Sequence, residues 1–285
     1  LVDHVIFSPR ANIRFNPSEA VNLRVSYAGG YRAPQAFDED MHIAVVGGKR
    51  VRIRLADDLK EERSHSVSLS ADLYHNFGRV QTNLLVEGFY TILDDVFALR
   101  DLEDTDDGGK IKERYNGSGA AVRGFNVEGR AIFTRWFELQ AGVTLQQSRY
   151  KEPEQWSEDA DVPPVRRMFR TPDAYGYFTA SFKPVRNFTA DLTGTCTGSM
   201  LVQHMAGSGV AQDAAVSTPS FFDMNVRLSY DLRIYKEITL QLYGGVQNLF
   251  NAYQKDFDKG ADRDSGYIYG PSLPRSWFVG AKFSF

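Results

Sequence analysis

Residues 222–232 read FDMNVRLSYDL, and this stretch decides the class of fold. Apolar residues occupy every second position, and Asp, Asn, Arg and Ser stand between them. A period of two is typical of a β-strand that has one apolar and one polar face. The same alternation returns in residues 137–145, 238–247 and 277–285. We therefore expect an all-β chain whose strands separate two different environments.

The alternation, followed outward from these runs, predicts eleven antiparallel strands. Their expected ranges are 8–16, 20–31, 62–75, 80–95, 111–134, 137–149, 173–183, 187–202, 220–233, 238–249 and 274–285. Strands in soluble domains usually have about five or six residues, whereas a tilted strand that crosses a membrane needs about 9–11. Several of the expected strands reach that length. Strand length therefore favours a transmembrane β-barrel.

Short and long connections alternate between these strands. The short ones are 16–19, 76–79, 135–136, 184–186 and 234–237, and the long ones are 32–61, 98–110, 150–172, 203–219 and 250–273. Outer-membrane barrels have tight turns on the periplasmic side and long loops on the extracellular side. A soluble sandwich has no reason to keep every long loop at one end. The alternation therefore predicts an antiparallel transmembrane β-barrel.

The polar face of the strands carries charges that would be costly in a dry core. These charged residues are Arg14, Arg24, Asp72, Glu87, Glu128, Arg130, Arg227 and Lys282. We expect them to line a wide, wet lumen; the alternative is the solvent face of a one-sided sheet. Eleven strands leave an open edge, which lipid does not tolerate, so we expect partner strands upstream of Leu1. The chain shows no signal peptide, so we expect an exported protein to begin earlier.

Composition excludes several classes of protein. None of the 285 residues belongs to a run of 18 apolar residues, so no spanning helix is expected. The net charge of −3 argues against a nucleic-acid partner. The single cysteine, Cys196, excludes an internal disulfide and falls on the apolar face of its strand. Aromatic residues make up 13%, which fits two interfacial girdles or a rich soluble β core. Sequence motifs for hydrolases, zinc proteases and phosphate-binding loops are missing, so we expect no enzyme.

Four motifs and the last residue resemble the TonB-dependent receptors. The first motif is Ser8-Pro9-Arg10-Ala11 with Asn16-Pro17, and the second is Gly30, Tyr31, Arg32, Ala33 and Pro34, where a strand meets an extracellular loop. The third is Asp58–Ser64, which departs from the family pattern at Ala56, Asp57 and Glu61. The fourth is Val246–Asn251, with Asn248, Leu249 and Phe250, and the chain ends on Phe285. Their order and their places on the strands make the resemblance specific.

The resemblance implies a 22-stranded, plugged barrel in the bacterial outer membrane, of which residues 1–285 form the last eleven strands. It implies an N-terminal plug absent from this chain, contact of that plug with the TonB complex, and recognition of Phe285 by the barrel-assembly machinery. Such receptors sit in outer-membrane lipid and import a small nutrient ligand, such as a ferric siderophore, haem, cobalamin or a glycan. We favour a ferric siderophore or other metal chelate. The alternatives are a passive porin, a soluble or surface-attached adhesive protein, and an outer-membrane protease or lipase.

Residues near the expected extracellular ends are candidates for binding the ligand. They are Tyr31, Arg32, His42, Arg166, Arg167, Arg170, His204, Tyr253, Tyr267 and Tyr269. Histidine beside methionine suits haem iron. Arginine suits carboxylates and phosphates, including those of lipopolysaccharide, and tyrosine suits flat ligands. The alternatives are solvated loop residues for the histidines and arginines, and girdle or loop packing for the tyrosines.

Two acidic runs are interpreted as solvated loops. Residues 256–264 resemble a calcium loop by their alternating acids, but Gly260 replaces a ligand and the closing glutamate is missing. We expect Lys259 and Arg263 to balance these acids. The acids in 94–107 also fit a solvated loop. We therefore expect neither a metal site nor a cofactor.

Overall fold

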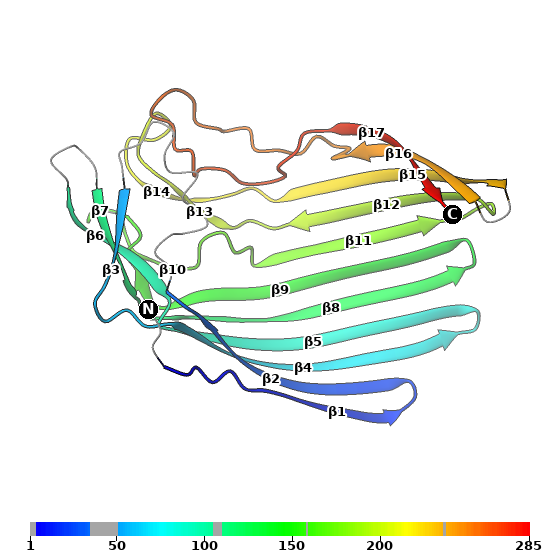
Figure 1. Ribbon diagram of the computed structural model, residues 1–285, viewed down its shortest axis with the longest axis horizontal. Coiled ribbons are helices and arrows are strands. Elements are labelled where there is room, and N and C mark those ends of the chain that lie inside the picture. Colours follow the sequence, from blue (N-terminus) through cyan, green and yellow to red (C-terminus); the bar gives the residue numbers. More distant parts are fainter. Residues whose placement is uncertain (1–3, 35–50, 105–109, 158, 236–237) are drawn as a thin grey trace.

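The computed structural model describes residues 4–34, 51–104, 110–157, 159–235 and 238–285. Every regular element in these residues is a β-strand (Figure 1). Within the described ranges, no helix is long and apolar enough to cross a membrane.

One curved sheet forms most of the molecule. Its main path consists of β1 (Arg10–Ser18), β2 (Val21–Arg32), β4 (Glu62–Phe77), β5 (Val80–Asp94), β8 (Ala120–Thr134), β9 (Phe137–Glu154), β11 (Ala174–Phe182), β12 (Phe188–Thr197), β15 (Phe221–Tyr235), β16 (Ile238–Gln247) and β17 (Ser276–Ser284). Each strand pairs antiparallel with the next, and the short β10 (Val165–Arg167) pairs with β9 beside this path. The predicted eleven-stranded antiparallel wall is confirmed.

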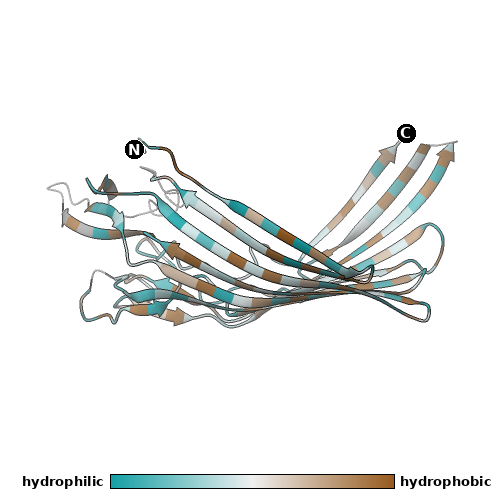
Figure 2. Cartoon of the chain, turned by 90° about the horizontal axis from the view of Figure 1, so that it is seen from below, coloured by the Kyte–Doolittle hydropathy of each residue, from teal (hydrophilic) through white to brown (hydrophobic). Residues whose placement is uncertain are grey.

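The arrangement of the connections is also confirmed. Hairpin turns lie at one end of the sheet and the long connections at the other (Figure 1). Seen from the side, the sheet bends into an open trough whose two edges rise on the same side (Figure 2). Long, tilted strands in a bent antiparallel sheet are the geometry of a barrel wall.

Two expected strands are interrupted where the chain leaves the main sheet. The expected strand 111–134 is two strands, β7 (Lys110–Asn116) and β8, because Gly119 between them has a left-handed backbone with φ of 87°. A side chain at Gly119 would collide with the carbonyl oxygen of Leu93. The expected strand 187–202 ends at Thr197, and β13 (Leu201–His204) lies outside the main sheet.

The long connections contain strands that the sequence pattern assigned to loops. β3 (Val51–Leu55), β6 (Phe97–Asp104) and β7 form a three-stranded sheet in which β3 and β7 are parallel. β13 and β14 (Ala214–Ser217) form a separate hairpin. Residues 97–104, which were expected to be loop, therefore form a strand that pairs with β7.

The register confirms two faces of different polarity. One row across the sheet holds Arg14, Arg24, Ser70, Glu87, Asn126 and Thr144, and the neighbouring row holds Ile13, Val25, Leu69, Gly88, Phe125 and Leu145. The apolar row is exposed, with 61% of Leu69 and 65% of Phe125 accessible. A soluble protein rarely exposes so broad an apolar surface, whereas a barrel presents one to lipid. We therefore call the apolar side the outer face and the charged side the inner face.

Charges on the inner face are held by partners on adjacent strands. The Glu128 carboxylate accepts hydrogen bonds from the Gln140 amide at 3.0 Å and the Tyr177 hydroxyl at 2.5 Å. Arg130 donates to Glu138 at 2.6 Å. Such cross-strand pairs favour one register, and they keep the charged wall ordered.

The segment Val246–Asn251 ends β16 and anchors the last long connection. Asn248 is buried and has a left-handed backbone with φ of 47°. Its amide nitrogen donates to the carbonyl oxygens of Ala252 and Leu273, each at 2.8 Å. Its amide oxygen accepts the Ala252 N–H at 2.8 Å. One side chain thus fastens both ends of the connection that precedes β17.

Candidate functional site

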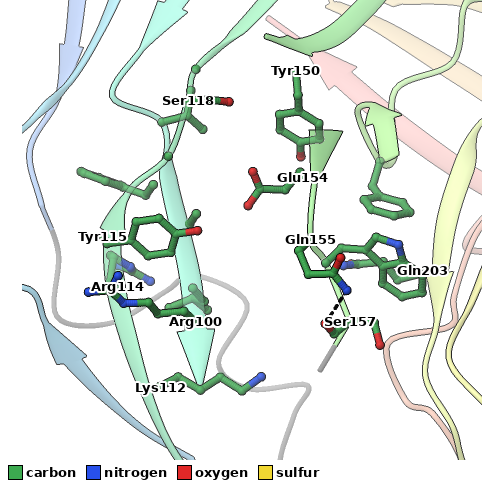
Figure 3. A pocket seen from close by; sticks show the side chains of 18 of the residues that line it. Arg100, Lys112, Arg114, Tyr115, Ser118, Tyr150, Glu154, Gln155, Ser157 and Gln203 are labelled. Carbon is green, nitrogen blue, oxygen red and sulfur yellow. Dashed lines mark hydrogen bonds between the residues drawn. The ribbon is translucent and has the colours of Figure 1, made fainter. Parts of the chain in front are cut away.

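The long connections cover one end of the inner face and enclose a cavity of about 630 Å³ (Figure 3). Its walls come from the β6–β7 hairpin, the end of β9, the segment after β9, and β13. The side chains that the argument uses are Arg32, Phe97, Arg100, Lys112, Arg114, Tyr115, Tyr150, Glu154, Trp156 and Phe169. A cavity of this size matches known small-molecule sites, which are on the order of 300–1,000 Å³.

Cationic side chains of this cavity lie on aromatic rings. The Arg32 guanidinium is 5.5 Å from the centre of the Phe97 ring, and that of Arg114 is 5.9 Å from the same ring. Arg100 lies 4.9 Å from the Tyr115 ring and donates through Nε to a carboxylate, Glu113, at 2.8 Å. A guanidinium on an aromatic face keeps its charge while its position is fixed. The cavity therefore presents ordered positive charges beside flat rings.

The electrostatic balance of the cavity favours an anion. Its described cationic residues are Arg32, Arg100, Lys112 and Arg114, and its described acid is Glu154. Arg32 also pairs with Glu62 at 3.5 Å and Arg100 with Glu113 at 2.5 Å, so these two charges are partly balanced from outside the cavity. Burial raises the pKa of Glu154, so this acid opposes the cations less than an exposed carboxylate would. Burial, together with the charge of Glu154, also raises the pKa of Tyr115 and keeps its hydroxyl a donor. The arrangement suits an anionic ligand with flat or apolar parts.

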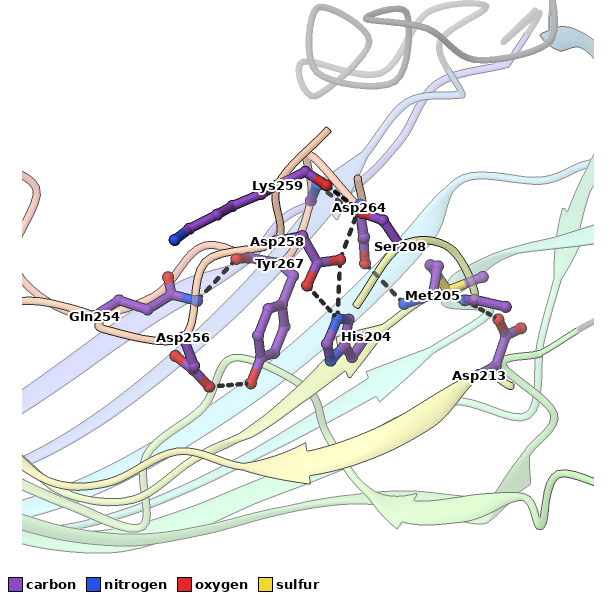
Figure 4. Close-up of polar contacts among 12 residues, drawn as sticks. His204, Met205, Ser208, Asp213, Gln254, Asp256, Asp258, Lys259, Asp264 and Tyr267 are labelled. Atoms are coloured by element: carbon purple, nitrogen blue, oxygen red, sulfur yellow. Dashed lines mark hydrogen bonds and ion pairs between the residues drawn. The ribbon is translucent and has the colours of Figure 1, made fainter. Parts of the chain in front are cut away.

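A cluster of hydrogen-bonded side chains joins the connection after β12 to the connection before β17 (Figure 4). We call it the loop latch; its members are His204, Gln254, Asp256, Asp258, Tyr267 and Tyr269. Nε2 of His204 lies 3.0 Å from each carboxylate oxygen of Asp258. The His204 ring stacks on Tyr267, with ring centres 3.7 Å apart and planes 3° from parallel. Hydrogen bonding and ring stacking thus hold the two connections together.

The tyrosines of the loop latch share one carboxylate. The hydroxyls of Tyr267 and Tyr269 donate to Asp256 at 2.8 and 2.5 Å. Burial and this hydrogen bond raise the pKa of Tyr267 to about 12, and the same causes raise that of Tyr269. Burial opposes the charge of Asp256, but the bonds from the two tyrosines outweigh it and hold the pKa below its ordinary value. At neutral pH the carboxylate is therefore a charged acceptor for two neutral donors.

The expectation of a solvated acidic loop is wrong for Asp258 and Asp264. Asp258 binds His204, and Asp264 accepts the backbone N–H of Met205 at 2.7 Å and of Gly266 at 2.8 Å. These acids build the connection. In the described part of the chain, His, Cys, Asp and Glu side chains form no group of three that could hold a metal ion.

The fold matches one protein family. A family model described as TonB dependent receptor-like, beta-barrel, matches residues 3–249. The chain belongs to the TonB-dependent receptor family. It is therefore part of a bacterial outer-membrane protein. The long connections of a TonB-dependent receptor lie outside the cell, and its hairpin turns face the periplasm.

Solved structures share the fold of this TonB-dependent receptor. The ferric-catecholate import receptor Fiu of Escherichia coli K12 is 18% identical with a TM-score of 0.60, over 95% of this chain and 34% of that chain. A mutant of the ferric enterobactin receptor PfeA from Pseudomonas aeruginosa is 16% identical with a TM-score of 0.66, over 96% and 39%. The copper transporter OprC is 13% identical with a TM-score of 0.65, over 98% and 39%. These identities show the fold alone, and the chain spans less than half of each structure. A comparison with curated protein sequences gives no match.

Two of the TonB-dependent receptor motifs have a clear physical basis at the start of the loops. A β-carbon at Gly30 would lie 2.6 Å from the Ser64 hydroxyl, so a larger residue there requires that hydroxyl to rotate away. Glu61, where the third motif departs from the family pattern, is buried and accepts a bond from Arg63 at 2.6 Å. That bond lowers the pKa of Glu61 to about 2. The departure therefore supplies a fixed charge at the start of β4.

The candidate ligand residues fall in different places. Arg32 lines the cavity. His204, Tyr267 and Tyr269 are buried in the loop latch. Arg170 supports the latch by donating to the carbonyl oxygen of Ile268 at 2.8 Å. Their part in ligand binding stays a prediction.

Arg166, Arg167, Tyr31 and Tyr253 do not line the cavity. Arg167 donates to the carbonyl oxygen of Ser199 at 2.8 Å and pairs with Asp173 at 3.2 Å. Arg166, Tyr31 and Tyr253 are exposed, and His42 lies outside the described residues. The three arginines therefore do not form one basic cluster.

Most cavity residues were not expected from the sequence. Lys112, Arg114 and Tyr115 lie on β7, which the alternation pattern merged with a membrane strand. Tyr150 and Glu154 lie on β9, which extends to Glu154, beyond its expected end at 149. The dense mixture of cations and one tyrosine in 110–116 is the signal that distinguishes this segment from the transmembrane runs.

Proposed function

We propose that the complete receptor imports an anionic metal chelate, such as a ferric siderophore, with energy supplied by the TonB complex. The observation that carries this proposal is the extracellular cavity, in which cations are held on aromatic rings. A ferric ion wrapped by several oxygen anions forms a bulky complex that is often negatively charged. Ordered guanidinium groups and flat rings match both properties. Haem and cobalamin are the alternative ligands.

The proposal includes parts that lie beyond this chain. The matched structures are more than twice as long, which supports additional barrel strands and a plug that contacts TonB. A sheet with two edges needs further strands to close in lipid. Phe285, fully exposed at the end of β17, would meet the barrel-assembly machinery. The family membership and the names of the solved structures support iron or another metal as cargo.

Binding by the full-length receptor tests the choice of ligand. The probes are an anionic ferric tris-catecholate and an uncharged ferric hydroxamate, titrated by fluorescence quenching. We expect Arg32→Gln and Lys112→Gln each to weaken binding of the anionic probe about tenfold, because each removes a charge that faces the cavity. Arg166→Gln is the matched control, since Arg166 is an exposed cation outside the cavity.

Two results would overturn the choice of an anionic chelate. One is equal loss of affinity for the uncharged and anionic probes in the cavity variants. The other is a loss in Arg166→Gln as large as that in Arg32→Gln, because general surface charge would then explain the binding.

A further inference from the structure

The extracellular cavity has an acidic end as well as a cationic end. A β-carbon at Gly117, at the base of the β6–β7 hairpin, would lie 3.8 Å from Oε2 of Glu154. Lys112 stands five positions before Gly117 in the chain, on β7, which is roughly 16 Å at about 3.3 Å per residue. The Glu154 carboxylate therefore lies at the base of the hairpin, and the lysine lies toward its tip.

The Glu154 carboxylate has no positive partner in the described part of the chain. It forms no hydrogen bond or ion pair there, whereas Glu62 pairs with Arg32 and Glu113 with Arg100. Burial raises the pKa of Glu154, as expected for a carboxyl group that lacks a positive neighbour. The cations of the cavity thus leave this acid unbalanced.

Aromatic residues lie beside this carboxylate. The side chains of Tyr115 and Tyr150 point toward Glu154 (Figure 3). Burial, and then the negative charge of Glu154, raise the pKa of both hydroxyls. The rings of Trp156 and Phe169 line the same cavity and pack edge to face, with their centres 5.3 Å apart. A carboxylate among aromatic rings suits an ammonium group, because ring faces attract cations.

A second unfilled polar group lies two residues along the same segment. Nε1 of Trp156 is buried and, among the described residues, has no hydrogen-bond acceptor. Buried donors in proteins are nearly always paired, so this N–H is available to an oxygen atom of a ligand. An acceptor at Glu154 and a donor at Trp156 therefore both line the cavity without a partner.

Gln155 and Ser157 hold this segment in place. The Gln155 amide nitrogen donates to the carbonyl oxygens of Ser157 at 3.1 Å and of Val162 at 3.3 Å. The Ser157 hydroxyl donates to the Asp213 carboxylate at 2.7 Å, which ties the segment to the connection before β14. A segment fixed in this way loses little conformational entropy when a ligand binds.

We propose that Glu154 forms an ammonium subsite, through which the receptor selects metal chelates that carry a protonated primary amine beside their anionic centre. The anionic centre faces the cationic end of the cavity, with Lys112. The amine donates to Glu154 among the rings, and the Trp156 N–H donates to an oxygen atom of the arm between them. The assignment rests on the proposed function, because it names a chemical feature of the same cargo. An ammonium group at Glu154 supplies the positive partner that this partly buried carboxylate lacks.

A matched pair of chelates tests the subsite in the full-length receptor. The probes are a ferric tris-catecholate that carries one primary amine and the same chelate with that amine acetylated, titrated by fluorescence quenching. We expect the wild type to bind the amine form about tenfold more tightly. Glu154→Gln should abolish this preference by weakening the amine form about tenfold while leaving the acetylated form unchanged. Glu152→Gln is the matched control, because Glu152 is an exposed acid two positions away on β9 and outside the cavity.

Trp156→Phe tests the donor separately. This variant keeps a ring and removes the N–H, so both probes should bind several-fold more weakly and by the same factor. A preference for the amine that persists in Glu154→Gln would overturn the subsite. Equal, tight binding of both probes to the wild type would also overturn it and would leave the proposed function standing. Failure of the wild type to bind either probe would overturn both.

Discussion

Replacement of Asn248 by alanine should release the connection between β16 and β17. The substitution removes three buried hydrogen bonds, two to the carbonyl oxygens of Ala252 and Leu273 and one from the Ala252 N–H. At about 1 kcal/mol each these contribute about 3 kcal/mol. Alanine at the left-handed φ of 47° adds about 1 kcal/mol of strain. The expected loss is therefore about 4 kcal/mol.

Asn251→Ala is the matched control for this prediction. Asn251 also has a left-handed backbone, with φ of 53°, but its side chain accepts one bond, from the Arg275 N–H at 2.9 Å. The same reckoning gives about 2 kcal/mol for this variant. The difference of about 2 kcal/mol isolates the two additional hydrogen bonds of Asn248. Asn248→Gly also loses the three hydrogen bonds but has no backbone strain at a left-handed φ. Its loss of free energy should therefore lie between those of the two alanine variants.

Hydrogen–deuterium exchange of the full-length receptor in detergent measures the effect where it occurs. Amides in 252–273 report the free energy of local opening. We expect their exchange to accelerate roughly 1,000-fold in Asn248→Ala and roughly 30-fold in Asn251→Ala. Exchange rates within threefold of each other in the two variants would refute the role assigned to Asn248.

Three further predictions concern charged and titrating groups at the loop ends. His204→Ala leaves the Asp258 carboxylate with the backbone N–H of Asp264 but without the imidazole, and should lower the opening free energy of both connections by about 2 kcal/mol, read by hydrogen exchange; unchanged exchange would contradict it. Because the pKa of Tyr267 is raised to about 12 from 10, its contribution to stability is complete below pH 10 and is lost as the pH rises through 12. Difference titration at 295 nm against Tyr267→Phe checks this, and ionisation near pH 10 would disprove it. The pKa of Glu61 is lowered from 4.5 to about 2 by its hydrogen bond with Arg63, so its contribution is present above pH 4.5 and is lost as the pH falls through 2. Thermal unfolding across that window should be less pH-dependent in Glu61→Gln, and an unchanged pH dependence would count against the bond.

The sequence predicted the wall of the barrel because the signal is local. Alternation in 222–232 and 238–247 predicts which side chains face lipid. The pairing of β15 with β16 puts the apolar residues of both runs on the same face, as expected. The strand breaks are less visible, since Gly119 interrupts a segment whose polarity continues to alternate on both sides. The need for glycine at position 119 comes from the carbonyl oxygen of Leu93, with which a side chain would collide. Leu93 lies on a neighbouring strand, so the need is not visible in the local sequence.

The site could not be read from sequence because its contacts are between distant segments. The hydrogen bond between His204 and Asp258 joins residues 54 positions apart, and the acidic pattern of 256–264 indicated a solvated loop instead. Likewise, β7 is held at the cavity by parallel pairing with β3. The hydrophobic periodicity of a single segment cannot predict such a contact between distant segments. The arginines Arg166 and Arg170 are close in sequence, yet Arg170 donates to the carbonyl oxygen of Ile268 while Arg166 pairs with Glu152.

Uptake of an iron-55-labelled ferric tris-catecholate by cells that express the full-length receptor tests the proposed function most directly. The measurement compares cells with and without TonB, and cells with and without a proton gradient. The account predicts uptake that requires both TonB and the gradient, and little ion conductance of the purified receptor in a planar bilayer. Uptake that persists without TonB, together with a steady open-channel conductance, would contradict energy-coupled import and indicate a passive porin.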